Sequence, residues 1–338
     1  MKTRPPQARR QRETLKECAG CSLVNSVHRG SHPRLHILPY WPTVLRFILT
    51  NASRRVAGSV TMQPMMSPDT YSLLDQQSGT WHYGLIARWW SEFNKAESNE
   101  LDYYRSAIRK FGEPVVDLGC GTGRLLVPLA ADGLDIDGID ISADMIAAAK
   151  AQLRTPRTGQ LWVQALHELR LDRTYRTAFM CGVLGIGGSR DHDREALRRA
   201  CQHLEPGGAL LVTHQLPYDG EEGWSDWLPG HRAGYPPPWP DEGDRRRTAD
   251  GDEIELLSRV AEFDPLQQLI VLEMRARLWH DESVVKEESY SLKSCLYFAQ
   301  ELLSMLSDAG FGDVVVEGDY TGMPATADDG NVIFVARR

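Results

Sequence analysis

The segment VVDLGCGTG at residues 115–123 constrains the fold of this chain more than any other. An apolar, β-branched run ending at Leu118 predicts a buried strand, and Asp117 places an acid at its end. Gly119, Gly121 and Gly123 then allow a tight turn and a close approach of the backbone to a ligand. A helix is expected directly after the turn, with its free N–H groups facing an anion. The segment therefore predicts a ligand-binding strand–turn–helix unit.

Short β-branched runs and amphipathic helices alternate along the rest of the main body. This alternation is typical of a doubly wound α/β fold, a mostly parallel sheet with helices on both faces. The expected strands are 115–118, 135–139, 160–164, 177–181, 209–213, 314–317 and 332–336, and the expected helices are 124–131, 143–153, 192–204 and 298–309. The predicted core therefore comprises residues 111–214 and 293–338.

Residues 215–292 interrupt the alternation. A loop rich in Trp, Pro and Gly comes first, and segments 253–263, 268–279 and 284–292 then alternate like antiparallel strands. They predict a small antiparallel β cap that leaves the core after its fifth strand. Two interpretations of the loop aromatics stay open: they cover a bound substrate as a lid, or they pack onto the cap's own sheet. The aromatics are Tyr218, Trp224, Trp227, Tyr235 and Trp239.

The N-terminal region differs in texture from the rest. Residues 62–110 are expected to contribute N-terminal helices that cover the site, with helical spacing of apolar residues from 81 to 110. Residues 1–61 hold eleven Lys and Arg against two acids and show no periodicity, which predicts a basic, disordered extension. Met62, Met65 or Met66 offers an alternative start. A zinc site in the extension is a weaker alternative, and its ligands would be Cys18, Cys21, His28, His32 and His36.

Charge and composition exclude several classes of partner. The net charge of −8 leaves residues 62–338 at −17, because the extension carries +9, and an acidic body disfavours nucleic acid. No stretch approaches the roughly 20 apolar residues of a membrane-spanning helix. The six cysteines are scattered, which favours a reducing cytoplasm over a disulfide scaffold. We therefore expect a cytoplasmic protein with no membrane or nucleic-acid partner, and the oligomeric state stays open.

The order of strand, acid, glycines and helix at 115–124 resembles motif I of the class I S-adenosylmethionine-dependent methyltransferases. Arg124 stands where a dinucleotide-binding fingerprint would need its third glycine. Three further segments are similar to the family's later elements: the turn LEPGG at 204–208, AGFGDVVVEG at 309–318 and NVIFVARR at 331–338. The resemblance implies a seven-stranded sheet whose last strand is antiparallel, with S-adenosylmethionine as cofactor.

The resemblance also implies a set of cofactor-binding residues. In the family an acid ending the second strand binds the ribose, which is Asp140 here, and the residues after it flank the adenine. Many members carry an aspartate where Ala165 stands, so this chain departs from the pattern there. The expected cofactor-binding residues are Tyr83, Asp117, Gly119, Cys120, Gly121, Gly123, Asp140, Ile141, Met145, Ala165, Leu166 and Cys181.

Methyl transfer needs a nucleophile held in line with an already electrophilic methyl group, without a covalent intermediate or a metal. The expected acceptor is a small molecule with an N or O nucleophile. His214, at the exit of the fifth strand, is the candidate general base or a hydrogen-bonding spacer. Two alternatives stay open, a non-catalytic cofactor-binding regulator and an aminopropyl transferase. The latter would need acids after the fourth strand, where Gly182, Val183 and Leu184 stand.

Overall fold

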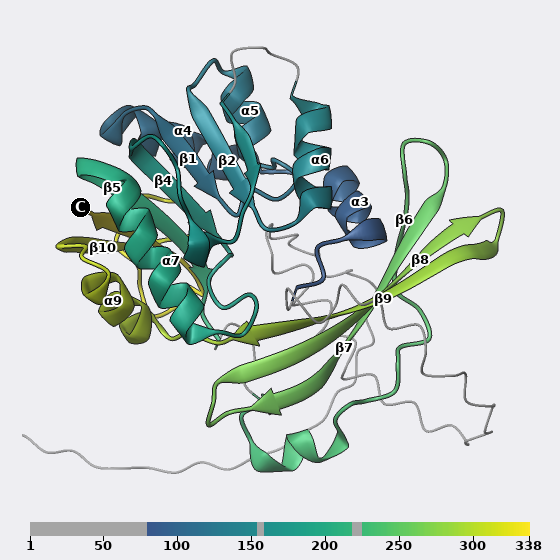
Figure 1. Ribbon diagram of the computed structural model, residues 1–338. Coiled ribbons are helices and arrows are strands. Elements are labelled where there is room, and N and C mark those ends of the chain that lie inside the picture. The colour runs from purple at the N-terminus through teal and green to yellow at the C-terminus, as the bar shows by residue number, and fades with distance from the viewer. Residues whose placement is uncertain (1–79, 154–158, 218–224) are drawn as a thin grey trace, which may run out of the picture. The chain divides into compact units, whose positions relative to one another are not determined.

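The computed structural model describes residues 80–153, 159–217 and 225–338, which form two β-sheets with flanking helices (Figure 1). All of them belong to the unit that spans residues 39–338. The predicted extension 1–61, with the cysteines and histidines considered for zinc, lies outside the described residues. So do Tyr218 and Trp224 of the cap loop. In the described part of the chain no helix is long and apolar enough to cross a membrane.

The larger sheet confirms the predicted fold class. Its seven strands follow the order β10-β11-β5-β4-β1-β2-β3. Strand β11 pairs antiparallel with both β10 and β5, and every other pairing in the sheet is parallel. The strands are β1 Val115–Leu118, β2 Ile136–Asp140, β3 Leu161–Val163, β4 Tyr175–Cys181, β5 Leu204–Gln215, β10 Asp313–Gly318 and β11 Asn331–Arg337.

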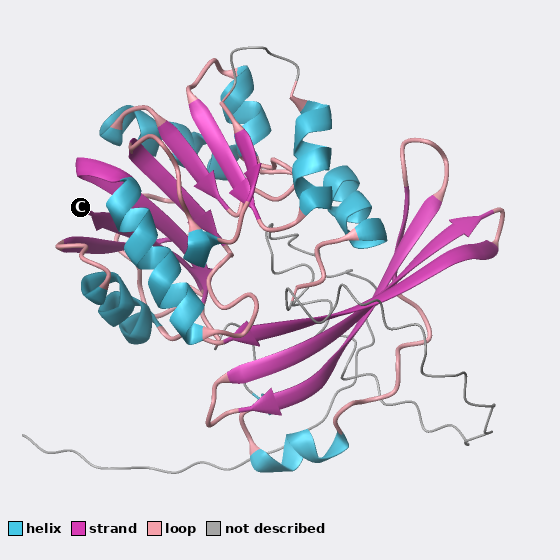
Figure 2. Cartoon of the chain, in the orientation of Figure 1, coloured by secondary structure: helices cyan, strands magenta, loops and turns pink. Residues whose placement is uncertain are grey.

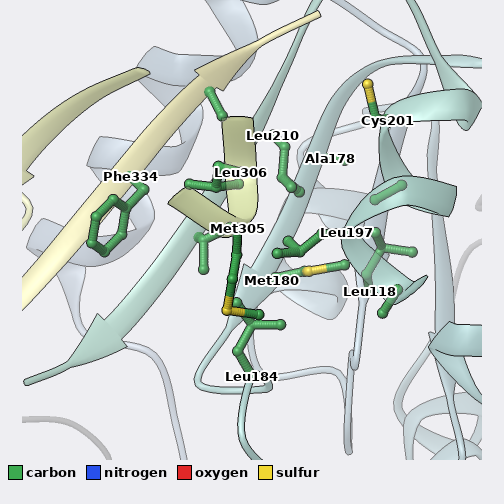
Figure 3. Close-up of a cluster of buried hydrophobic side chains, with 14 of the residues drawn as sticks. Leu118, Ala178, Met180, Leu184, Leu197, Cys201, Leu210, Met305, Leu306 and Phe334 are labelled. Atoms are coloured by element: carbon green, nitrogen blue, oxygen red, sulfur yellow. The ribbon is translucent and has the colours of Figure 1, made fainter. Parts of the chain in front are cut away.

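Helices cover both faces of this sheet, as Figure 2 shows. They are α3 Gly84–Phe93, α4 Ser98–Phe111, α5 Leu126–Ala131, α6 Ala143–Gln152, α7 Arg190–His203 and α9 Ala299–Asp308, with short 3-10 turns at Leu166–Glu168 and Pro229–Gly234. Successive strand residues point to opposite faces, so β1 feeds two separate cores. Leu118 packs in the core beneath α7 and α9, together with Leu197 and Met305 (Figure 3), whereas Val115 packs against α4 and α5.

The element boundaries differ from prediction where turns interrupt the pattern. Strand β5 begins at Leu204 rather than 209, because Leu204 pairs with Tyr175 while Ala209 pairs with Thr177, and the residues between them loop out. The first helix of the core, α5, begins at Leu126 rather than 124, since the glycine turn continues past Gly123. Gly207 has a φ of +78°, which explains why a glycine stands in that loop.

The smaller sheet is the predicted cap, but it has four strands rather than three. Their order is β6-β7-β8-β9, all antiparallel: β6 Asp244–Arg247, β7 Glu253–Asp264, β8 Leu269–His280 and β9 Ser283–Cys295. Strand β6 has the sequence DRRR and therefore lacks the apolar alternation that identifies a strand. It pairs with β7 through the backbone and through ion pairs from Arg245 and Arg247 to Glu253.

Two contacts fix the cap against the core. The last residues of β9 bond to the loop after β4: Gly187 N–H donates to Lys293 O at 2.8 Å and Cys295 N–H to Gly185 O at 2.9 Å. Helix α3 packs Trp89 and Trp90 in one apolar cluster with cap residues of β7 and β8. The cap therefore lies at the carboxyl end of β4, beside the end of the sheet where ligands bind in open α/β folds.

The three described loop aromatics pack against protein side chains. Trp227 lies edge-on to Phe263 at 5.1 Å between ring centroids, and its ring centroid is 5.5 Å from that of Phe298. The Trp239 ring lies over the guanidinium of Arg259, and Tyr235 O–H donates a hydrogen bond to Asp226 Oδ1. None of the three lines either of the two cavities described below. Their contacts favour the packing interpretation over a lid made of these side chains.

Candidate functional site

A cleft of about 970 Å³ opens at the carboxyl ends of β1, β2, β3 and β4. Its floor is the glycine turn after β1, and its walls come from the segment before and within α3, the ends of β2 and β3, the loop after β4, the start of α7, and strand β9 of the cap. Elements far apart in sequence therefore build one site.

The glycine turn leaves space for a ligand. Gly121 has a φ of +54°, and a Cβ added to it would meet no protein atom within 4 Å, although the residue lines the cleft. A Cβ at Gly119 would instead clash with Val183. At Gly121 the missing side chain leaves room for a ligand beside the backbone. At Gly119 glycine is required because Val183 packs against it.

The sequence suggested free N–H groups facing an anion, but three N–H groups of the turn bond within the protein. Gly119 N–H and Cys120 N–H both donate to Ile139 O, at 2.7 and 2.9 Å. Gly121 N–H donates to Asp140 Oδ2 at 2.9 Å. Helix α5 begins only at Leu126, beyond the turn. The backbone donors of the turn hold its own shape and orient Asp140.

Asp140 is the best-oriented acid of the cleft. Oδ2 accepts the Gly121 bond and Oδ1 accepts Ser142 N–H at 2.8 Å. Burial raises the pKa of this carboxyl, while these backbone donors oppose the rise. A carboxylate offers about four lone-pair sites, so both oxygens keep capacity for hydroxyl donors in the cleft. The geometry fits a ribose with two adjacent hydroxyls.

Asp117 and Arg124 add charge below the turn. Asp117 is 3% exposed, and burial raises its pKa to about 7, against the opposing effect of the nearby Arg124 guanidinium. Arg124 forms an ion pair with Glu100 of α4, whose side chain is completely buried. Both Asp117 and Arg124 line the cleft, so it contains a carboxyl that titrates near neutrality and a cation held by a carboxylate.

We expect the buried carboxyl of Asp117 to make stability fall as pH rises. The unfolded state loses this proton near 3.8 and the folded state only near 7, so the folded form binds more protons between these values. Relative to Asp117→Asn, the free energy of unfolding should fall by at most about 1.4 kcal/mol per pH unit in that window. Urea denaturation at several pH values measures it. The exposed Asp191→Asn serves as control, and an unchanged difference between wild type and Asp117→Asn would contradict the assignment.

The far end of the cleft suits a flat apolar group. Met145 is buried and Ile141 is 40% exposed, and both line it with Ala165 and Leu166. The rings of His167 and His192 stack at 3.7 Å between centroids on the opposite side. Burial is the main cause that lowers the pKa of His167, and the interaction with His192 lowers it further. Among the described residues that line the cleft, Gln164 is the polar side chain that neighbours Ala165.

Most predicted cofactor residues come together in this cleft. Those that line it are Asp117, Gly119, Cys120, Gly121, Asp140, Ile141, Met145, Ala165, Leu166 and Cys181. Gly123 and Tyr83 do not. Gly123 has a φ of +86° and shapes the turn, and Tyr83 is the N-cap of α3, whereas the adjacent His82 lines the cleft. Burial lowers the pKa of His82 to about 4, so its ring is neutral.

Several lining residues were missed by the sequence reasoning. Thr80, His82, Asn94, Arg124, His167, His192, Ser291 and Lys293 belong to this group. Only Arg124 had a local signal, because it follows the glycine turn directly. At the start of α7, Ser189 accepts the capping bond from His192 N–H. Asp193 binds Gly185 N–H at 3.0 Å and Tyr297 O–H at 2.6 Å, which fixes the loop after β4.

A second, smaller cavity of about 90 Å³ adjoins the cleft and contains His214 in its lining. Arg124, Cys181, Gly182, Leu184 and Ile186 line both cavities, so the two share a boundary at the ends of β1 and β4. The second cavity lies between the end of β5 and the cap strands β8 and β9.

A buried hydrogen-bond network supports the floor of this second cavity. Tyr104 O–H lies 2.6 Å from Thr213 Oγ1 and 2.7 Å from Cys181 Sγ. Burial raises the pKa of the Cys181 thiol strongly, so this cysteine is an inert thiol rather than a nucleophile. The network fixes the ends of β4 and β5, where two bound groups would meet.

Comparison with known proteins identifies the core. Residues 115–208 match the family model described as a methyltransferase domain. The core of this chain therefore contains a methyltransferase domain and shares the fold of an S-adenosylmethionine-dependent methyltransferase. A methyltransferase of Geobacillus sp. (strain WCH70) is 22% identical over 264 residues, which cover 76% of this chain and 99% of that relative.

Further relatives share parts of the methyltransferase domain. A ubiquinone biosynthesis O-methyltransferase of Photorhabdus laumondii is 26% identical over 157 residues, 44% of this chain and 64% of the relative. Two solved structures share the fold. The S-adenosylmethionine-dependent methyltransferase of Clostridium acetobutylicum has a TM-score of 0.58 at 14% identity and covers 75% of this chain and 97% of its own. The sugar N-methyltransferase KedS8 of Streptoalloteichus sp. has a TM-score of 0.54 at 20% identity and covers 84% and 98%.

The residues of the cleft fit S-adenosylmethionine as the cofactor of this methyltransferase domain. The open space over Gly121 and the oriented carboxylate of Asp140 fit the ribose, and the pocket between Met145 and Leu166 fits the adenine. Among the described residues, no group of three or more His, Cys, Asp or Glu side chains could hold a metal ion.

Proposed function

We propose that this methyltransferase transfers the methyl group to an N or O nucleophile of a small molecule bound in the second cavity. The observation that carries the proposal is the boundary shared by the two cavities at Cys181, Gly182 and Leu184. In-line transfer needs the nucleophile within near-attack distance of the methyl carbon, and adjoining cavities provide such an arrangement. When bound, the cofactor supplies the electrophilic methyl group; the chain positions the acceptor and excludes water.

The same proposal assigns the ten predicted cofactor residues that line the cleft by their place in it. Asp140 would hold the ribose, Ile141 and Met145 the adenine, and Asp117 with the glycine turn the methionine end. The N-terminal segment would cover that end through His82 and Trp90, which line the cleft beside Asn94. The four described cysteines are free thiols, which supports a reducing compartment such as the cytoplasm.

His214 is our candidate for the group that accepts the proton of the acceptor. Its Nε2 lies 3.2 Å from the Tyr297 carbonyl oxygen, so Nε2 carries the hydrogen and donates, which leaves Nδ1 as a proton acceptor. Burial lowers the pKa of His214 to about 4, so the ring is neutral at physiological pH. A neutral imidazole lining the acceptor cavity suits a base or a hydrogen-bond acceptor.

We expect His214→Asn to lower turnover by about a hundredfold, the lower end of the usual contribution of a general base. S-adenosylhomocysteine affinity should stay unchanged, since His214 does not line the cofactor cleft. Initial rates and calorimetric titration separate the two effects. His280→Asn, on the exposed turn of the cap, is the control. Equal loss of turnover and cofactor affinity would show that His214 acts on structure instead.

The overall reaction is tested with isotope-labelled S-adenosylmethionine and a fractionated metabolite extract. Label in a small-molecule fraction supports the proposal, and mass spectrometry of that fraction separates N- from O-methyl products. The names of two relatives, an O-methyltransferase of ubiquinone biosynthesis and a sugar N-methyltransferase, suggest compounds to include. Cofactor binding with no transfer would favour a regulator, and reaction with only the decarboxylated cofactor an aminopropyl transferase.

A further inference from the structure

The wall that the cap contributes to the second cavity is aliphatic. Ile270 and Leu272 on β8 and Leu292 on β9 line it. Leu272 pairs directly with Leu292 across the two strands, so their side chains lie on the same face of the cap. Leu184 and Ile186 from the loop after β4 continue the same surface on the core side. A bound molecule would therefore contact branched hydrocarbon over most of this wall.

Five polar side chains on the opposite, core side have protein partners, and the Gln215 side chain also lines this side. Thr213 Oγ1 bonds to Tyr104 O–H, and His214 Nε2 bonds to the Tyr297 carbonyl. The side chains of Tyr320 and Asn331 hydrogen-bond each other, and Arg124 pairs with Glu100. A hydroxyl buried without a hydrogen-bond partner costs about 1–3 kcal/mol, so each extra hydroxyl on a ligand would be penalised here.

The charges on the residues that line the second cavity also favour a ligand with few polar groups. No Asp or Glu is among the described residues that line the second cavity, and Arg124 is the one residue there that carries a formal charge at neutral pH. A ligand with several ammonium groups would lack a carboxylate to accept its protons. This lining accommodates a ligand with one polar group, which would face His214.

We propose that the acceptor is a molecule with an apolar aromatic or alicyclic body and a single O or N nucleophile, selected by Ile270, Leu272 and Leu292. The inference rests on the proposed function and deepens it by naming the acceptor's chemical class. It distinguishes this chain from a sugar methyltransferase, whose substrate carries several hydroxyls, although the fold of one such enzyme is shared.

Matched probes test the class of ligand directly. Cyclohexanol and inositol have the same carbon ring, but cyclohexanol carries one hydroxyl and inositol carries a hydroxyl on every carbon. Phenol carries one hydroxyl on an aromatic ring. Saturation-transfer NMR on the full-length protein with bound S-adenosylhomocysteine detects weak binding of each. We expect binding of phenol and cyclohexanol and none of inositol. Preferential binding of inositol, or no binding of the apolar probes to a protein that holds S-adenosylhomocysteine, would overturn the inference.

Variants of the wall locate the selectivity. Leu272→Ala and Leu292→Ala should each weaken phenol binding about tenfold, because each removes three carbons of the apolar wall, of which a bound phenol contacts a part. Leu266→Ala on the neighbouring turn is the matched control, since Leu266 is 88% exposed. If the alanine variants fail to fold, Leu292→Asn replaces them in the test. It keeps most of the side-chain volume and should also weaken phenol binding.

The two levels of the hypothesis fail differently. Loss of S-adenosylhomocysteine binding or of all methyl transfer in the wild type would count against the proposed function. Folded wall variants that bind S-adenosylhomocysteine normally, and that also bind phenol as the wild type does, would refute only the assignment of Ile270, Leu272 and Leu292.

Discussion

Asp140→Ala should weaken S-adenosylhomocysteine binding by about a hundredfold. The carboxylate is positioned by two backbone donors and keeps lone pairs toward the cleft, so it is expected to accept both ribose hydroxyls. A hydrogen bond to a charged group contributes about 1.5–3 kcal/mol, and a hundredfold change in affinity corresponds to about 2.7 kcal/mol, so the net loss of one such bond already explains the effect. Calorimetric titration measures it. Asp140→Asn should bind with intermediate affinity, since one amide oxygen remains as an acceptor.

Two glycines provide a matched control for the same site. Gly121 and Gly133 both have positive φ, and a Cβ at either would meet no protein atom within 4 Å. Only Gly121 lines the cleft. Alanine at both positions should carry similar backbone strain, yet only Gly121→Ala should reduce cofactor affinity. Wild-type affinity in Asp140→Ala and Gly121→Ala would defeat the assignment of the cofactor site.

Glu100→Gln should lower the free energy of unfolding by about 3–5 kcal/mol, the usual cost of removing one partner of a buried ion pair. Glu100 is completely buried and the Arg124 side chain is 12% exposed, so the variant removes the carboxylate that faces a largely buried guanidinium. Denaturant titration at neutral pH measures the change. The exposed pair of Arg194 and Asp191 is the control, and Asp191→Asn should change stability by less than about 1 kcal/mol.

A double variant separates charge from packing in the same pair. Glu100→Leu combined with Arg124→Met removes both charges and keeps apolar volume, so it should recover most of the lost stability. A double variant as unstable as Glu100→Gln would show that packing, rather than the uncompensated guanidinium, explains the loss. Because Arg124 lines both cavities, cofactor affinity of the double variant is measured separately.

The fold was largely predictable because its signals are local. Alternating strands and helices identified the parallel core, and the resemblance supplied the antiparallel β11. The cap was predicted one strand short, since β6 consists of charged residues and forms only because β7 offers its edge and Glu253 its carboxylate. Local periodicity cannot reveal a strand that forms only because it pairs with a neighbouring strand.

The sequence by itself determined the glycine turn, the acid at the end of β2 and the position of the cap, because each depends on neighbouring residues and their spacing. Only the tertiary structure decided which side chains from α3, α7 and β9 complete the cleft, that His82 rather than Tyr83 faces it, and that Arg124 pairs with Glu100. Those contacts join residues distant along the chain. The physical reason is that burial and charge pairing depend on the packing of whole elements, which no local pattern encodes.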